Sequence, residues 1–500
     1  MGVIIRQSFW NMVVTYAGFV LGAVNTLFLY THFFSTENYG LVMSLVSVSA
    51  IVMPFIAVGM NNALVRFLPR EADKDRLLSF TLLVPTVIFL VLGAVVYGKG
   101  EALAEFFPQG ELIRDFVSLA FWIAVFSAFF EVFFGYAQAH MRSTEGVFLR
   151  EMFYRIATTV LLFAVHFGWI GEIQFCYWIT ASFALRMLLM AWVAYRCRPF
   201  RLRWPSVRKY RKIISYGLFS SMGMAIWAAL LEFDKSILPF YESLTTEAYY
   251  TIAVFIGMTV AVPYRSLYQI ANPVLAKAIA EKDTARQEDL SCKSSMNSLI
   301  LCGGLFLLIN CNIHDIYRLL PSGYEAGVSV VLIISLAKLF DSISGLAGSF
   351  IVYSRYFRWD LVFSFCLMAS VIGSNLYFIP RWGMNGAAVS TLISLLVVNS
   401  LRVGFVYLKT GHFPFRWNSL VLAGVLAVFY GVFSWWDFSF GSGPVATVGA
   451  IVVKSLLIAL LFGAVVLKGG FSPELASLGR SALGKVFPGR SGREKALGGP

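Results

Sequence analysis

Residues 77–98 read LLSFTLLVPTVIFLVLGAVVYG, a run of 22 residues without a charged side chain, bounded by Arg76 and Lys99. A helix needs about 20 apolar residues to cross the hydrocarbon core of a bilayer. Comparable runs recur along nearly the whole chain of 500 residues, of which 58% are hydrophobic and only 13% charged. Soluble domains average about 25% charged residues. The composition therefore excludes a water-soluble globule and predicts an all-α integral membrane protein.

The hydropathy pattern predicts fourteen spanning helices joined by short connections. The first apolar run is too long for the apolar region of a cleavable signal peptide and lacks a small-residue cleavage site, so we expect it to remain as the first span. The expected spans cover residues 8–33, 39–64, 77–98, 112–138, 146–167, 173–195, 213–238, 245–271, 292–313, 323–349, 358–379, 383–408, 416–435 and 445–467.

Positive charges are distributed unevenly over the connections. Alternate loops and the tail carry most lysines and arginines, above all residues 196–212 with eight of them. Because lysine and arginine accumulate on the cytoplasmic side, we expect both termini in the cytoplasm and the protein in the bacterial inner membrane. This pattern accounts for the net charge of +13 without nucleic-acid binding, and basic loops also attract anionic membrane lipid. The opposite loops are expected to carry acids such as Glu37, Glu242 and Glu247.

An internal repeat occurs at an offset of 210 residues. Residues 35–39, STENY, align with residues 245–249, TTEAY, and the same offset aligns Glu131 with Asp341. Six spans per copy is an even number, so the copies share one orientation, as in transporters built from two parallel repeats. The expected organisation is an N-terminal lobe with its basic connector, a C-terminal lobe, spans thirteen and fourteen, and a flexible basic cytoplasmic tail. These segments cover residues 1–211, 212–410, 411–467 and 468–500.

Ionisable side chains inside spans are costly and mark transport pathways or ion pairs. A carrier of a phosphorylated substrate needs cations there, and arginine binds phosphate with two parallel hydrogen bonds. Amide side chains suit sugar hydroxyls. The candidate substrate-binding residues are Arg155, Arg186, Lys338, Arg66, Lys235, Arg265, Asn25 and Asn62. The candidates for coupling to an ion gradient are the acids Glu131, Asp341 and Asp234.

Structural explanations compete with this interpretation for the same residues. Lys338 and Asp341 stand three apart on one helical face, where they can neutralise each other. Glu131 can pair with Arg155 or Arg186. Asp234 and Lys235 lie near the outer end of the seventh span, within reach of water, and Arg265 lies near a cytoplasmic end, where its head group can also reach water.

Motifs for catalysis, cofactors and metals are missing from the sequence. It has no Walker-type GxxxxGK[ST], no GxSxG and no HExxH. Its six cysteines are scattered without a CxxC pair, and its five histidines are not clustered. We therefore expect neither an enzyme nor a metal or cofactor site. Without a nucleotide motif, a proton or sodium gradient is the expected source of energy.

Three stretches of the chain carry a family resemblance: residues 36–40, TENYG, residues 59–67, GMNNALVRF, and residues 379–388, IPRWGMNGAA. They resemble the polysaccharide-biosynthesis flippases, the O-antigen (Wzx-type) and related exporters of the multidrug/oligosaccharidyl-lipid/polysaccharide (MOP) superfamily. The resemblance covers about residues 1–410. It implies translocation of undecaprenyl-pyrophosphate-linked sugar units to the periplasmic leaflet, by alternating access between two six-helix lobes. It also implies partners in polysaccharide assembly, such as a glycan polymerase, as in lipopolysaccharide synthesis.

Three other functions remain open from the sequence. A multidrug or cation antiporter of the same superfamily is disfavoured because the in-span charges lean basic. A membrane-embedded glycan polymerase or ligase is disfavoured because the longest outer loop covers only about residues 97–111. A non-catalytic scaffold for a glycan-assembly complex is a further alternative.

Overall fold

The structure is a computed structural model that describes residues 2–98, 111–140, 142, 144–204, 210–436, 441 and 443–471. Within these ranges the secondary structure is helical, without strands. Eleven helices are long and apolar enough to span a bilayer. The predicted all-α membrane class is confirmed. The predicted outer loop at 97–111 and the cytoplasmic tail fall largely outside the described residues.

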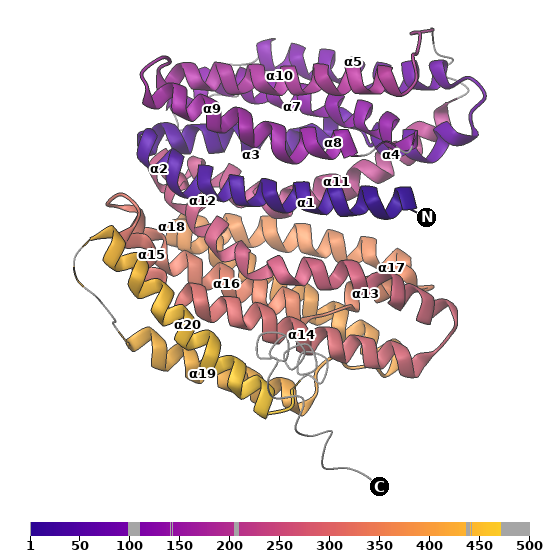
Figure 1. Ribbon diagram of the computed structural model, residues 1–500. Coiled ribbons are helices and arrows are strands. Elements are labelled where there is room, and N and C mark those ends of the chain that lie inside the picture. The colour runs from indigo at the N-terminus through magenta and orange to yellow at the C-terminus, as the bar shows by residue number, and fades with distance from the viewer. Residues whose placement is uncertain are drawn as a thin grey trace. The chain divides into compact units, whose positions relative to one another are not determined.

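The chain forms two compact units. Unit 1 comprises residues 1–255, 320–327 and 364–390. Its long helices α3, α7 and α10 run side by side in the indigo-to-magenta part of Figure 1, with α7 packed against both of the others. The helices of its main segment are α1 (Gly2–Val24), η1 (Asn25–Leu29), α2 (Tyr30–Phe33), α3 (Thr36–Ala57), α4 (Met60–Phe67), η2 (Leu68–Arg70), α5 (Lys74–Gly98), α7 (Glu111–Ala139), α8 (Thr144–Phe148), η3 (Leu149–Phe153), α9 (Tyr154–His166), α10 (Glu172–Cys197), α11 (Arg211–Ile237), η4 (Leu238–Phe240) and α12 (Leu244–Met258).

Unit 2 comprises residues 256–319, 328–363 and 391–500. Its helix α14 packs against α13, α16, α19 and α20, the last two drawn in yellow in Figure 1. The remaining helices of the chain are η5 (Thr259–Ala261), α13 (Val262–Ala280), α14 (Thr284–Asn310), α15 (Ile313–Arg318), η6 (Tyr324–Gly327, in unit 1), α16 (Val328–Ile343), α17 (Ala347–Tyr353), α18 (Phe357–Thr410, shared by both units), α19 (Trp417–Trp435) and α20 (Pro444–Lys468).

The fourteen predicted spans are compatible with these helices. Helix α18 is two helices joined at Gly383, whose φ of 52° and ψ of −132° interrupt the helical backbone. Counting both parts of α18, adding α11, and taking α8, η3 and α9 together extends the eleven apolar helices to fourteen. The division into lobes at residues 211 and 212 stays a prediction.

Two helices that the predicted repeat equates begin in the same way. Helices α5 and α14 start at Lys74 and Thr284, which are 210 residues apart. Before each helix an aspartate accepts a hydrogen bond from the backbone N–H three residues on, Asp73 from Arg76 and Asp283 from Arg286. Such caps satisfy N–H groups that the first helical turn leaves free. The cap at Asp283 also explains why α14 begins eight residues before the predicted span at 292.

The second predicted span is broken into two helices, α3 and α4, in unit 1. Val58 and Gly59 adopt left-handed backbone angles between α3 and α4, with φ of 46° and 61°. For a β-branched valine this conformation is strained. The break is enclosed by glycines of neighbouring helices, because a Cβ at Gly135 would meet the Asn61 backbone and one at Gly217 the Val58 carbonyl. Glycine here lets the backbones of α4, α7 and α11 approach closely.

Candidate functional site

Unit 1 contains two groups of buried and partly exposed charges. The first, the basic cluster, consists of Arg150, Arg155, Arg186, Glu131 and Glu151. Arg150 and Glu151 lie in η3, a π-helical turn between α8 and α9. A π-turn inside a spanning helix shifts side chains out of the regular helical register and is common at functional sites. Arg155 follows one turn later on α9, while Glu131 and Arg186 come from α7 and α10.

Two of the three arginines in the basic cluster have carboxylate partners. Arg150 forms an ion pair with Glu131, and its guanidinium lies 4.3 Å from the centre of the Phe134 ring. Arg155 donates from Nη1 to Glu151 Oε2 at 2.9 Å. Glu131 therefore pairs with Arg150, which lies inside the predicted span 146–167. No ion pair among the described residues joins Glu131 to Arg155 or Arg186, the two partners expected from the sequence.

Arg186 has no such partner among the described residues. It is 9% exposed, and its Nη2 donates to the Ser127 hydroxyl at 3.3 Å. The guanidinium is held between aromatic faces, 4.5 Å from the Phe130 centroid and 4.7 Å from that of Phe183. Its Nε is buried without a hydrogen-bond acceptor. Three arginines against two glutamates leave the basic cluster with one positive charge in excess.

Two glycines of α1 allow the Arg155 side chain to lie close against that helix. A Cβ at Gly18 would stand 2.8 Å from Arg155 Nη1, and one at Gly22 would stand 2.8 Å from Nε. The two glycines are four residues apart and thus form a smooth stripe against which the guanidinium lies. This stripe is a small-xxx-small pattern, the usual signature of close helix packing in membranes, and it is the sequence signal that would have linked α1 to Arg155.

The second group, the acidic cluster, consists of Glu232, Asp234, Lys235 and Glu247 on α11 and α12. Lys235 Nζ lies 3.0 Å from Glu232 Oε2. Glu232 also accepts from the Ser47 hydroxyl at 2.9 Å. Three carboxyl groups face a single ammonium, so the cluster carries an excess of two negative charges when every acid is ionised.

Hydroxyl groups hold the other two acids of the acidic cluster. Tyr250 donates to Asp234 Oδ2, and Ser44 donates to Glu247 Oε2. Glu247 is fully buried, and its Oε1 has no hydrogen-bond donor. The close approach of α3 to α12 that this requires depends on Gly40, because a Cβ there would collide with the Leu244 carbonyl.

The structure corrects two expectations about these acids. The sequence placed Glu247 in an outer loop, whereas it lies in the first turn of α12 and is buried. Asp234 was expected within reach of water, yet it is 6% exposed. Glu247 lies two residues inside the start of the predicted span at 245, and its charge alone placed it among the acids of the outer loops. Ser44 and Ser47, three apart on α3, are the polar pair that could have indicated buried acids on a neighbouring helix.

The basic and acidic clusters belong to the same compact unit. The charges of Arg186 and Arg155 in the basic cluster and of Glu232 in the acidic cluster all act on the Tyr154 hydroxyl.

Other candidate residues of unit 1 have structural partners or lie at the surface. Asn25 is buried, donates to the Arg155 carbonyl at 2.9 Å and accepts from Thr159 at 2.8 Å, so it ties η1 to α9. Asn62 lies half-buried on α4. Arg66 is exposed, with its guanidinium 4.6 Å from the Tyr216 ring centroid.

The candidates of unit 2 do not form the predicted pair. Asp341 accepts a hydrogen bond from Asn399 Nδ2 at 2.8 Å, and no ion pair joins it to Lys338. The three-residue spacing placed both side chains on one helical face, but Asn399 of α18 provides the nearer donor. Arg265 of α13 is exposed, as expected for a side chain that reaches water.

No group of three metal-binding side chains occurs among the described residues. The basic cluster offers donors for an anion, and the acidic cluster offers acceptors for a proton or a cation.

The fold is that of a multi-pass membrane transporter. Similar solved structures include the lipid II flippase MurJ in an inward closed conformation, with a TM-score of 0.68, 13% identity, and coverage of 92% of this chain and 99% of that one. An inward-facing multidrug resistance MATE family transporter gives a TM-score of 0.55, 13% identity and coverage of 85% and 94%. A MOP superfamily transporter from Pyrococcus furiosus gives a TM-score of 0.51 and 14% identity, with coverage of 82% of this chain and 95% of that one.

The sequence profile of the polysaccharide biosynthesis protein family matches residues 4–279, more than half of the chain. The chain belongs to this family, as the resemblance in its sequence indicated. No curated protein sequence compared with the chain is a significant match.

Proposed function

We propose that this protein is a flippase that moves undecaprenyl-pyrophosphate-linked oligosaccharides across the bacterial inner membrane for surface polysaccharide assembly, such as O-antigen of lipopolysaccharide. The observation that carries the proposal is Arg186, a buried guanidinium in a spanning helix with no carboxylate partner among the described residues. An uncompensated buried cation is costly. A pyrophosphate supplies the missing negative charge and accepts paired hydrogen bonds from the guanidinium.

In this mechanism the basic cluster binds the pyrophosphate and the protein acts as a carrier, without making or breaking a bond. Phe130 and Phe183 restrict the guanidinium plane of Arg186, so little side-chain entropy is lost when the phosphate binds. The candidates Lys338, Arg66, Arg265, Asn25 and Asn62 are assigned secondary roles at most. Alternating access between two lobes would then expose the bound substrate to the periplasmic side.

The acidic cluster is the proposed coupling site for protons or sodium ions. Glu247 has an unoccupied carboxylate oxygen, and Lys235 offsets only one of three acids. A proton or cation entering from outside reduces this excess, so its movement down a gradient can drive the return of the carrier. Asp341, in unit 2, is the second candidate coupling acid.

The acidic cluster also favours one alternative, a multidrug or cation antiporter, since three buried acids attract cations. The two functions require different substrates at the two clusters. Under the flippase proposal the basic cluster contacts the transported molecule, whereas under the antiporter alternative the acidic cluster does.

The purified full-length protein reconstituted into liposomes distinguishes them. We expect a fluorescent pyrophosphate-linked oligosaccharide to become accessible to a membrane-impermeant quencher on the opposite leaflet, and an ethidium-type cation to remain where it is. Cation movement without oligosaccharide movement would overturn the flippase proposal. Movement of neither in any imposed gradient would favour a scaffold role in a complex with a polymerase.

A further inference from the structure

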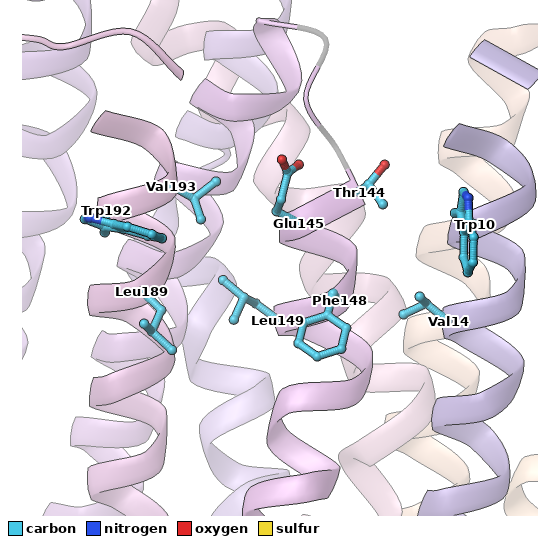
Figure 2. A pocket seen from close by; sticks show the side chains of 9 residues that line it. All are labelled: Trp10, Val14, Thr144, Glu145, Phe148, Leu149, Leu189, Trp192 and Val193. Atoms are coloured by element: carbon cyan, nitrogen blue, oxygen red, sulfur yellow. The ribbon is translucent and has the colours of Figure 1, made fainter. Parts of the chain in front are cut away.

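A lipid-facing groove of unit 1 lies apart from both charge clusters. It has a volume of about 390 Å³ and runs between α1, the α8–η3 segment and α10. Figure 2 shows Trp10 and Trp192 on opposite walls, with Phe148 between them and Leu189 and Val193 beside Trp192. The exposed lining is apolar, and the polar side chains Thr144 and Glu145 lie at one end.

The location of this groove in the membrane indicates which class of ligand it binds. Trp10 is 49% exposed and Trp192 is 53% exposed, although both belong to helices that span the membrane. Exposed apolar side chains on spanning helices face lipid, and tryptophan concentrates where the hydrocarbon meets the head groups. A groove with such walls takes up a hydrocarbon chain in preference to water or a sugar.

Two arginines lie at the same end as Glu145. The Arg196 guanidinium lies 4.2 Å from the centroid of the Trp192 ring. Arg142 and Glu145 both interact electrostatically with the thiol of Cys197, the next residue after Arg196. Both arginines are exposed, and neither has an ion pair with a described residue. Two arginines and one glutamate leave this end of the groove with one positive charge in excess.

We propose that the groove binds an anionic phospholipid of the surrounding bilayer, with one acyl chain between Trp10 and Trp192 and its phosphate against Arg142 and Arg196. A phosphodiester carries one negative charge, which matches the single excess positive charge. The pyrophosphate of a prenyl-linked substrate is more highly charged, and Glu145 would repel it. Basic pockets between spanning helices on the cytoplasmic side are suited to such head groups, and positive-inside sorting predicts that side for Arg142 and Arg196.

The test is the melting temperature of the full-length protein in detergent, with added phosphatidylglycerol or phosphatidylcholine of identical chains. We expect phosphatidylglycerol to raise it more. In the double variant Arg142→Gln/Arg196→Gln the two lipids should become equivalent, with phosphatidylglycerol bound about 5-fold more weakly per arginine lost. The matched control is Arg381→Gln, which removes an exposed arginine stacked 3.8 Å from the Tyr377 ring and should preserve the difference.

A second variant tests the chain-binding part of the groove. Val193→Trp fills the groove and should abolish the response to both lipids, whereas Leu460→Trp on the lipid-facing side of α20, where the leucine is 71% exposed, should not. If Val193→Trp does not fold, the arginine variants decide alone. An equal preference for phosphatidylglycerol in the wild type and the double arginine variant overturns the proposal. So does stabilisation by undecaprenyl pyrophosphate but not by phosphatidylglycerol, because the occupant would then be the tail of the substrate.

Discussion

The basic and acidic clusters of unit 1 are built alike but carry opposite charge. Each sits between spanning helices, and each retains buried polar atoms without a hydrogen-bond partner. These are the Nε atoms of Arg150 and Arg186 in the basic cluster and Glu247 Oε1 in the acidic cluster. The basic cluster has an excess of one positive charge and the acidic cluster, when every acid is ionised, an excess of two negative charges. A purely structural set of ion pairs would balance its charges, because an unpaired buried charge is destabilising. The residual charge is therefore the part that calls for a functional explanation.

The clusters also differ in their place along the helices. Arg150 lies six residues into the helical segment that begins at α8, and Glu131 lies eight residues before the end of α7. Both flank the 140–143 connection, which the distribution of arginines predicts to be cytoplasmic. Asp234 and Glu247 flank the connection between α11 and α12, which is predicted to be periplasmic. An anion would thus be received from the inside and a proton or cation from the outside.

The largest expected effect is all-or-none and concerns this sidedness. In a cysteine-free background, Trp169→Cys should react with an impermeant thiol reagent added from the periplasm, and Trp204→Cys should not. Both positions are highly exposed, at 77% and 87%, so accessibility of the side chain itself is matched. Labelling of Trp204→Cys alone would invert the topology and exchange the sides assigned to the two clusters.

Much of the fold was predictable from the sequence, because the bilayer requires long apolar helices and the positive charges sort the loops. The interruptions of the helices were not predictable. The break at Val58 and Gly59 and the π-turn η3 both lie inside continuous apolar runs. The site was predictable only as a list of charged residues. Which acid pairs with which base depends on how each helix is rotated about its own axis. That rotation is determined by contacts such as those of Arg155 with Gly18 and Gly22. Glu247 was counted with the acids of an outer loop although the predicted span begins at residue 245. The sequence does not reveal that Ser44 of another helix donates a hydrogen bond to its carboxylate.

The second prediction tests the basic cluster. Arg186→Ala should lower oligosaccharide export, normalised to folded protein, by about 100-fold or more, because two charge-assisted hydrogen bonds of about 1.5–3 kcal/mol each are lost. Arg186→Lys should restore part of it, since the charge remains but the planar fork does not. The measurement is surface glycan per amount of inserted protein.

A purely structural role for Arg186 gives a different pattern. Protein abundance would fall together with export in Arg186→Ala, and adding Glu131→Gln would restore both. Wild-type export per folded protein in Arg186→Ala would remove this arginine from the substrate site. Arg155 would then be the next residue to test.

The third prediction tests the acidic cluster through Glu247→Gln. One coupled charge at 100 mV is equivalent to about 2.3 kcal/mol, or an accumulation ratio of about 50-fold. We expect the variant to lose this ratio and equilibrate the oligosaccharide, while binding of the pyrophosphate stays unchanged. The assay is transport into liposomes with and without an imposed proton or sodium gradient. The control is Ser49→Ala on the same helix as Ser44. The Ser49 hydroxyl donates to the Val46 carbonyl of its own helix. A gradient response of wild-type size in Glu247→Gln would show that coupling resides elsewhere, with Asp341 as the next candidate.

The smallest expected effect separates ion-pair stability from function within the basic cluster. Glu131→Gln removes the partner of Arg150 and also one of the acids that interact with Arg186. A fully buried pair broken in this way costs about 3–5 kcal/mol, but the Arg150 side chain is 38% exposed, so solvent screens part of the charge that is left. We therefore expect a loss of about 1–2 kcal/mol in unfolding free energy. The control is Asp289→Asn, whose partner Lys293 and own side chain are each 48% exposed, and which should cost less than about 1 kcal/mol. Both are measured by denaturant unfolding in detergent.

Glu131→Gln also raises the excess positive charge of the basic cluster from one to two, so it should tighten pyrophosphate binding. Arg186→Ala should weaken that binding, and this difference in direction distinguishes the two variants. A variant that is destabilised and binds pyrophosphate more weakly would show that Glu131 holds the arginines in position, and that the excess charge is not what selects the substrate.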